Sequence, residues 1–184
     1  MKMLLMTRLV FGFITVCAVA MLPATTFAQQ RFKVESNSEG QVGRYTQQLT
    51  IDVADIPGHQ VRVVEIHYTY NDKSRFAFKG VKVREGWARG YSDQVNGIGP
   101  AWGYVVYLLE DGDRVTGQYS GTAEGELTST GSRKGTYRGT TKLTGGSGKY
   151  KGVRGLIVTS VRYDTDQTQG YNVSDSKGEY WFED

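Results

Sequence analysis

Cysteine, proline and histidine are scarce in this chain of 184 residues, which holds one cysteine, three prolines and two histidines. Because Cys17 is the only cysteine, no disulfide can form within the chain. His59 and His67 lack a partner at the spacing of a zinc site, so we expect no metal ion. We also expect no cofactor. After residue 30, no segment sustains the spacing of an amphipathic helix. These absences argue against disulfide-stapled, zinc-binding and helical proteins.

The first 28 residues are predicted to be a signal peptide rather than part of the fold. Lys2 and Arg8 form a basic start, residues 9–22 are an almost uninterrupted apolar run, and Ala28 ends a small-residue cleavage site. The run is shorter than the roughly 20 residues that span a bilayer. We therefore expect a secreted or periplasmic protein with no membrane anchor after cleavage.

Removal of this segment makes the chain almost neutral. Lys2 and Arg8 leave with it, so 22 basic and 19 acidic residues become 20 and 19, and the formal charge falls from +3 to +1. A nucleic-acid-binding protein needs a clustered basic face, so we expect no nucleic acid partner. The remaining 156 residues suffice for a single domain with its own core.

The rest of the composition is typical of an all-β protein. With 24 glycines and 12 tyrosines, the chain divides into about eight extended segments joined by Gly, Asp and Asn turns. Consecutive hairpins without helices predict antiparallel pairing. A two-sheet sandwich is the rival architecture, but glycines inside long strands favour a single eight-stranded barrel over residues 44–184. Residues 29–43 are polar and predict a loose N-terminal arm with a short strand around residues 32–34. Residues 105–109 are expected to be the most buried strand.

A glycine-rich segment gives the most specific signal. It predicts a tight reversal between two strands, with positive φ angles expected at Gly146 and Gly148. The segment resembles the hallmark hairpin of the allene oxide cyclase-like barrels, which include the dirigent proteins, and two upstream segments resemble the glycine-broken strands that precede it there. The residues that carry this resemblance are Thr144-Gly145-Gly146-Ser147-Gly148-Lys149-Tyr150-Lys151-Gly152-Val153-Arg154-Gly155, Tyr119-Ser120-Gly121-Thr122-Ala123-Glu124-Gly125 and Tyr137-Arg138-Gly139-Thr140.

The resemblance implies an eight-stranded barrel with an apolar cavity. In that superfamily the cyclases close a ring in an unstable fatty-acid epoxide, and the dirigent proteins orient phenoxy radicals for stereoselective coupling. The matched motif is structural, so the resemblance carries neither group's catalytic residues onto positions of this chain.

One strand carries a face that is rich in functional groups. Strand alternation places Glu85, Trp87, Arg89 and Tyr91 on one side. If this side faces inward, Trp87, Arg89 and Tyr91 bind a mostly apolar ligand and Glu85 acts as a fixed polar or acid–base group. The alternative is an outer face with solvated ion pairs, which is the commoner arrangement in proteins.

A second strand offers a proton-transfer pair. Glu65 and His67 share one side of it and are expected to meet Glu85 on a neighbouring strand, because paired residues stand roughly 5 Å apart. A histidine beside a carboxylate is a common acid–base arrangement. A half-exposed strand with His67 outside is the alternative.

Three functions follow from these residues. The first is a dirigent-like protein that binds or orients a small, mostly apolar molecule. The second is a cyclase or isomerase that uses a cavity carboxylate from Glu85 or Glu65, with His67. The third is a structural barrel whose interior is filled by side chains. Oligomerisation is compatible with all three.

Overall fold

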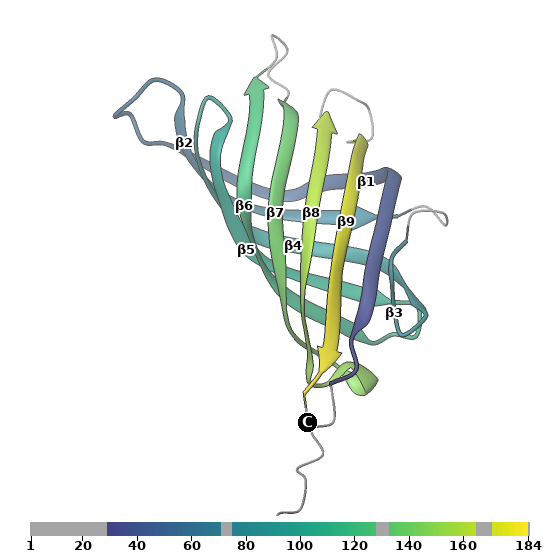
Figure 1. The fold of residues 1–184 in the computed structure, drawn as a ribbon. Helices are drawn as coiled ribbons and strands as arrows, with labels where there is room; N and C mark the ends of the chain where they lie inside the picture. Colours follow the sequence, from purple (N-terminus) through teal and green to yellow (C-terminus); the bar gives the residue numbers. More distant parts are fainter. Residues whose placement is uncertain (1–28, 71–74, 128–132, 165–170, 184) are drawn as a thin grey trace, which may run out of the picture.

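The computed structural model describes residues 29–70, 75–127, 133–164 and 171–183. The predicted signal peptide lies outside the described residues. The described chain is built from strands and one short 3-10 turn, shown in Figure 1. They are β1 (Phe32–Asp52), β2 (His59–Thr69), β3 (Ala77–Phe78), β4 (Val81–Val95), β5 (Ile98–Leu109), β6 (Arg114–Leu127), β7 (Arg133–Gly146), η1 (Gly148–Tyr150), β8 (Val153–Asp164) and β9 (Tyr171–Phe182).

Eight long strands close into one antiparallel barrel, as the sequence predicted. Neighbouring strands follow the order β2-β1-β9-β8-β7-β6-β5-β4, and β2 also pairs with β4, which joins the two ends of the sheet. The two-residue strand β3 pairs with the start of β4 and is additional to this ring. Closure leaves no free edge among the eight long strands, which removes the unpaired backbone groups that an open sheet exposes.

The first strand corrects the prediction of a polar arm over residues 29–43. Residues 32–42 pair with β9 from Phe32↔Tyr180 to Val42↔Tyr171, and residues 42–52 pair with β2. Val34 points into the hydrophobic core, whereas Gln41, farther along β1, points into the barrel interior beyond that core. The segment is polar because part of the barrel interior is itself polar, so low hydrophobicity here does not indicate a loose chain.

The glycine-rich connection between β7 and β8 is held against the turn between β5 and β6. The Ser147 hydroxyl donates to Asp113 Oδ1 at 2.8 Å and accepts from the Arg114 backbone N–H at 3.0 Å. Gly148 has a φ of +50°, as expected, and a Cβ there would overlap the Asp113 carboxylate. Gly146, in contrast, does not have a positive φ; a Cβ there would stand 2.6 Å from the Arg114 carbonyl oxygen. The two glycines therefore serve different purposes, positive φ at one and close backbone approach at the other.

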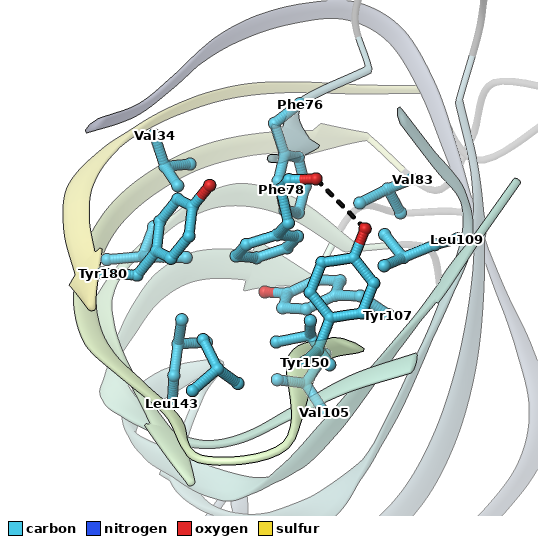
Figure 2. Close-up of a cluster of buried hydrophobic side chains, with 13 residues drawn as sticks. Val34, Phe76, Phe78, Val83, Val105, Tyr107, Leu109, Leu143, Tyr150 and Tyr180 are labelled. Carbon is cyan, nitrogen blue, oxygen red and sulfur yellow. Dashed lines mark hydrogen bonds between the residues drawn. The ribbon is translucent and has the colours of Figure 1, made fainter. Parts of the chain in front are cut away.

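A hydrophobic core fills one end of the barrel, near η1 and the end of β9 (Figure 1). Figure 2 shows Phe76 and Phe78, from the segment around β3, pointing into this end. The Phe78 ring lies 5.2 Å from Tyr180 between centroids, and its carbonyl accepts a hydrogen bond from the Tyr150 hydroxyl at 3.2 Å. The closed-end core consists of Val34, Phe76, Phe78, Val83, Val105, Tyr107, Leu109, Val115, Leu143, Tyr150, Val153, Ile157 and Tyr180.

The strand expected to be most buried contributes three of these side chains. Val105, Tyr107 and Leu109 point inward, which confirms residues 105–109 as a core strand. Val106 and Leu108 have the opposite parity and are half-buried on the outer side. Leu109 is 0% exposed, whereas Leu49, on the outer side of β1, is 59% exposed.

Leu109→Ala is expected to lower the free energy of unfolding by about 2–5 kcal/mol, because it leaves a cavity in the closed-end core. Leu49→Ala makes the same chemical change at an exposed position and is expected to change it by less than about 0.5 kcal/mol. Urea denaturation followed by circular dichroism measures both. Equal losses in the two variants would contradict this placement of the core.

Candidate ligand cavity

The barrel interior beyond the closed-end core holds a cavity of about 220 Å³. Its walls come from the strands of the ring and from Phe76. Most lining side chains are apolar or aromatic, with a small number of polar groups among them, which is the usual composition of a small-molecule site. The residues that define it are Gln41, Gly43, Tyr45, Arg62, Val64, Ile66, Tyr68, Tyr70, Phe76, Ala88, Tyr91, Ser92, Gln94, Ala101, Val105, Tyr107, Tyr119, Ala123, Tyr137, Thr141, Thr159, Val161, Tyr163, Ser174 and Ser176.

Tyrosine rings packed over glycines form much of the wall. A Cβ on Gly90 would overlap the Tyr119 hydroxyl, and one on Gly139 would overlap the Tyr137 hydroxyl. At Gly125 the same overlap would involve Tyr163. Because glycine has no side chain, these positions leave space on the inner wall. Large phenol rings from the same or nearby strands fill this space. This is why glycine and tyrosine are both abundant in the sequence.

A set of polar side chains lies on the inner wall away from the closed-end core. The Ser174 hydroxyl donates to Gln41 Oε1 at 2.7 Å, and the hydroxyls of Thr159 and Ser176 lie 3.0 Å apart. The Tyr137 hydroxyl is buried and has no hydrogen-bond partner within the described part of the chain. The cavity thus has an apolar end at Phe76 and a polar end where a ligand can form hydrogen bonds.

Burial keeps five of the cavity phenols neutral. It raises the pKa of Tyr107 to about 12, an effect that a hydrogen bond with Thr141 partly offsets, and it raises the pKa of Tyr119 to about 12. The pKa values of Tyr68, Tyr70 and Tyr137 are raised further, again because burial penalises the phenolate. At neutral pH these side chains can donate hydrogen bonds and stack, but they are poor proton acceptors.

Among the described residues that define the cavity, Arg62 is the one charged side chain, and it is 5% exposed. Its Nη2 donates to Gln48 Oε1, and its guanidinium lies 5.3 Å from the Tyr45 ring centroid. Its Nε is buried and has no hydrogen-bond partner among the described residues.

The predicted site residues lie together, but on the outer surface of the barrel. His67 Nε2 is 2.7 Å from Glu85 Oε2, and the Arg89 Nε donates to Glu65 Oε2 at 2.6 Å. The His67 ring stacks on Trp87 with 4.2 Å between centroids. The predicted contact of His67 with Glu85 is therefore confirmed, whereas Glu65 pairs with Arg89 instead of meeting Glu85.

The expectation that Trp87 and Glu85 line an interior cavity is wrong. A β-bulge lies between Val83 and Glu85, where Val83 pairs with Leu109 and Glu85 with Leu108. The extra residue, Arg84, reverses the alternation, so Val83 points inward but Ala88 and Ser92 are the inward residues beyond the bulge. Alternation counted from the inward Val83 without the bulge would place Glu85 and Trp87 on the inner face. With the bulge, these two side chains lie on the outer face.

Both outer carboxyl groups are held in the ionised form. Partial burial raises the pKa of Glu85, but the hydrogen bond with His67 and the neighbouring Arg84 outweigh it and lower the value overall. The hydroxyl of Thr46, followed by Arg89, lowers the pKa of Glu65 against the effect of desolvation. A catalytic role for Glu85, Glu65 and His67, or ligand binding by Trp87 and Arg89, stays a prediction and now concerns an open surface.

Tyr91 differs from the other predicted residues because it also borders the cavity. On the outer side it belongs to an apolar row across four strands, in which Leu49 pairs with Val63, Val63 with Tyr91, and Tyr91 with Trp102. All four side chains are exposed. Large apolar residues therefore occupy both faces of these strands, and hydrophobicity alone does not identify the inner face.

Sequence patterns single out neither Arg62 nor the cavity tyrosines other than Tyr91. Tyr107, Tyr119 and Tyr137 share strand parity with the core residues Leu109, Val115 and Leu143 on their own strands. Parity with a buried aliphatic residue near the closed end was the signal that could have identified them. Arg62 carries no such signal, because an arginine in a strand is ordinarily an outward residue.

Comparison with solved structures finds similarity to two pterocarpan synthase dirigent proteins. One is 12% identical with a TM-score of 0.40, over 95% of this chain and 100% of that chain. The other is 12% identical with a TM-score of 0.36, over 84% of this chain and 94% of that chain. No family model and no curated protein matches the chain. At these values the fold assignment rests on the strand pairing itself, which defines a closed, eight-stranded antiparallel barrel with a tyrosine-lined interior.

The protein is expected to lose stability as the pH rises from 10 towards 12. An unfolded tyrosine releases its proton near pH 10, whereas buried Tyr107 and Tyr119 release theirs near 12, so the stability that these groups contribute is complete below pH 10 and is lost above it. Each such group lowers the free energy of unfolding by about 1.4 kcal/mol per pH unit in this window.

Phenolate absorbance and near-ultraviolet circular dichroism, recorded through an alkaline titration, measure this effect. The buried phenols should ionise in the same transition in which tertiary structure is lost. Ionisation of every tyrosine near pH 10 with the tertiary signal intact would contradict the burial of these side chains.

Proposed function

We propose that this protein binds and orients a small, mostly apolar aromatic molecule inside the barrel. The observation that carries the proposal is the cavity of about 220 Å³, which is walled by tyrosine rings and bounded by the closed-end core. Aromatic rings offer large, rigid contact areas and prefer stacked or edge-to-face partners. A planar aromatic molecule suits such walls.

The volume limits the size of the ligand. An apolar cavity of about 150 Å³ holds one benzene molecule. The present cavity, at about 220 Å³, suits a molecule of one or two rings with a short substituent. A long, extended chain would have to reach beyond the enclosed space.

The polarity of the walls supports one orientation of the ligand. Its apolar part would contact Phe76, Val105 and Tyr107 near the closed end, where the wall has few polar atoms. Its polar group would lie near the hydroxyls and amides beyond, where Tyr137 has a hydroxyl without a partner in the described structure. A few fixed polar groups in an apolar cavity are sufficient to orient a ligand.

Binding is better supported than the cyclase or isomerase alternative. None of the described residues that define the cavity is aspartate, glutamate or histidine. The phenols of Tyr107 and Tyr119 have raised pKa values, so they are poorly suited to remove a proton at neutral pH. The proposed activity therefore depends on the shape of the cavity and on hydrogen bonding.

The proposed place of action follows from the N-terminal sequence. We propose that residues 1–28 are cleaved as a signal peptide and that the barrel acts in a secreted or periplasmic location. N-terminal sequencing of the protein from its native source would show a start at Gln29 in that case. Within the part of the chain that the structure describes, no helix has the length and apolar character that crossing a membrane requires.

The protein should bind the neutral aromatic probe 2-naphthamide with a dissociation constant between about 10 µM and 1 mM, measured by isothermal titration calorimetry. Ala123→Phe adds a ring to the cavity wall and is expected to weaken binding at least tenfold, because the added ring occupies ligand space. Ala88→Leu tests the same idea from another strand with a smaller addition.

Val158→Phe is the matched control, since it adds a ring at a side chain on the outer surface of β8 that is 55% exposed. It should leave binding unchanged. Thermal melts of all variants confirm that each is folded. If the folded wild-type protein does not bind the probe, or if folded Ala123→Phe and Ala88→Leu both bind it as the wild type does, the cavity is not the binding site.

A further inference from the structure

Arg62 occupies an unusual place for a charged side chain. It lies on the inner face of β2, among the residues that define the cavity, and is 5% exposed. Its partner in the strand ladder is Ser92 on β4, three residues before that strand ends at Val95. Arg62 and Ser92 therefore stand near the connection between β4 and β5, whereas the core residues Val83 and Leu109 pair at the opposite end of these two strands.

No carboxylate within the described part of the chain forms an ion pair with this guanidinium. Its contacts are a hydrogen bond to the neutral Gln48 amide and the face of the Tyr45 ring. Its Nε has no acceptor among the described residues. An amide and a ring face stabilise a cation, but neither supplies a full negative charge.

The carboxylates on the adjoining strand segments bind other partners. Asp52 accepts a hydrogen bond from Gln60 at 2.9 Å, Asp93 lies 2.7 Å from His59, and Glu65 pairs with Arg89. Glu65 and Asp93 are also on the opposite parity to Arg62 and Ser92, on the outer side of the sheet. Among the described residues, none of these carboxylates forms an ion pair with Arg62.

A buried charge without a counter-ion is costly. Removal of an ion from water is costly even after the protein relaxes, and a partner of opposite charge offsets that cost when it is close and well hydrogen-bonded. Arginine also presents its N–H groups in a planar fork that matches both oxygens of a carboxylate. The guanidinium in this cavity is therefore a preformed half of an ion pair whose other half is absent from the described chain.

We propose that the cavity ligand is an aromatic carboxylate, with its carboxylate on Arg62 and its ring directed towards Phe76 and Tyr107. This inference rests on the proposed function and adds the charge and the orientation of the ligand. The cavity volume suits one or two rings, and the inner wall is apolar at the end away from Arg62. The outer Arg89 has no such role, because Glu65 already neutralises it.

The test compares two probes of the same shape, 2-naphthoate and the neutral 2-naphthamide, by isothermal titration calorimetry at pH 7. The wild-type protein is expected to bind 2-naphthoate about 10- to 100-fold more tightly, because a charge-assisted hydrogen bond is stronger than a neutral one. Arg62→Gln should remove this preference while 2-naphthamide binding persists. Arg62→Lys should keep part of it, since the charge remains but the planar fork is lost.

Arg31→Gln is the matched control, because it removes an arginine charge that pairs with Glu179, where the arginine side chain is 59% exposed. This variant should retain the full preference for 2-naphthoate over 2-naphthamide. Equal affinity of the wild type for the two probes would overturn the inference and leave the proposed function standing. Failure of the wild type to bind either probe would overturn both. If folded Arg62→Gln and Arg62→Lys both keep the wild-type preference, Arg62 is not the anion site.

Discussion

The pairing of β2 with β4 is the constraint on which the rest of the structure depends. It joins the two ends of the sheet, so the inward side chains of eight strands must share one interior. Aliphatic and aromatic residues fill one end of that interior completely. At the other end, inward glycines such as Gly90 and Gly125 make room for the phenol rings of Tyr119 and Tyr163. Closure together with this exchange of small and large residues produces a cavity rather than a solid core.

The same constraint explains the electrostatics. The phenols of Tyr107 and Tyr119 are buried, so their ionisation is unfavourable and they act as neutral hydrogen-bond donors. Arg62 is the exception, a permanent charge at the polar end of a neutral cavity. The ionised pairs that sequence analysis singled out, Glu65 with Arg89 and Glu85 with His67, lie on the outer wall, where solvent reduces the cost of their charges.

Sequence patterns were sufficient for the architecture but not for the cavity. Turn residues such as Asn96 and Gly97, alternation and the absence of helical spacing predict eight antiparallel strands, and glycines inside strands favour the closed form. The error in the face of β4 arises from Arg84, one extra residue whose bulge reverses every later side chain. The prediction of a loose polar arm over residues 29–43 was wrong for a related reason, since β1 lines a polar part of the interior. Register and closure are long-range properties, and no local pattern contains them.

The central claim is that the open part of the barrel interior is a ligand site, and nuclear Overhauser effects test it most directly. In a spectrum of the protein with 2-naphthamide, the probe protons should show contacts to Val105, Ala123 and Tyr107 on the inner wall. Contacts confined to exposed side chains of the outer row, such as Leu49 and Trp102, would place the probe on the outer surface and contradict the account.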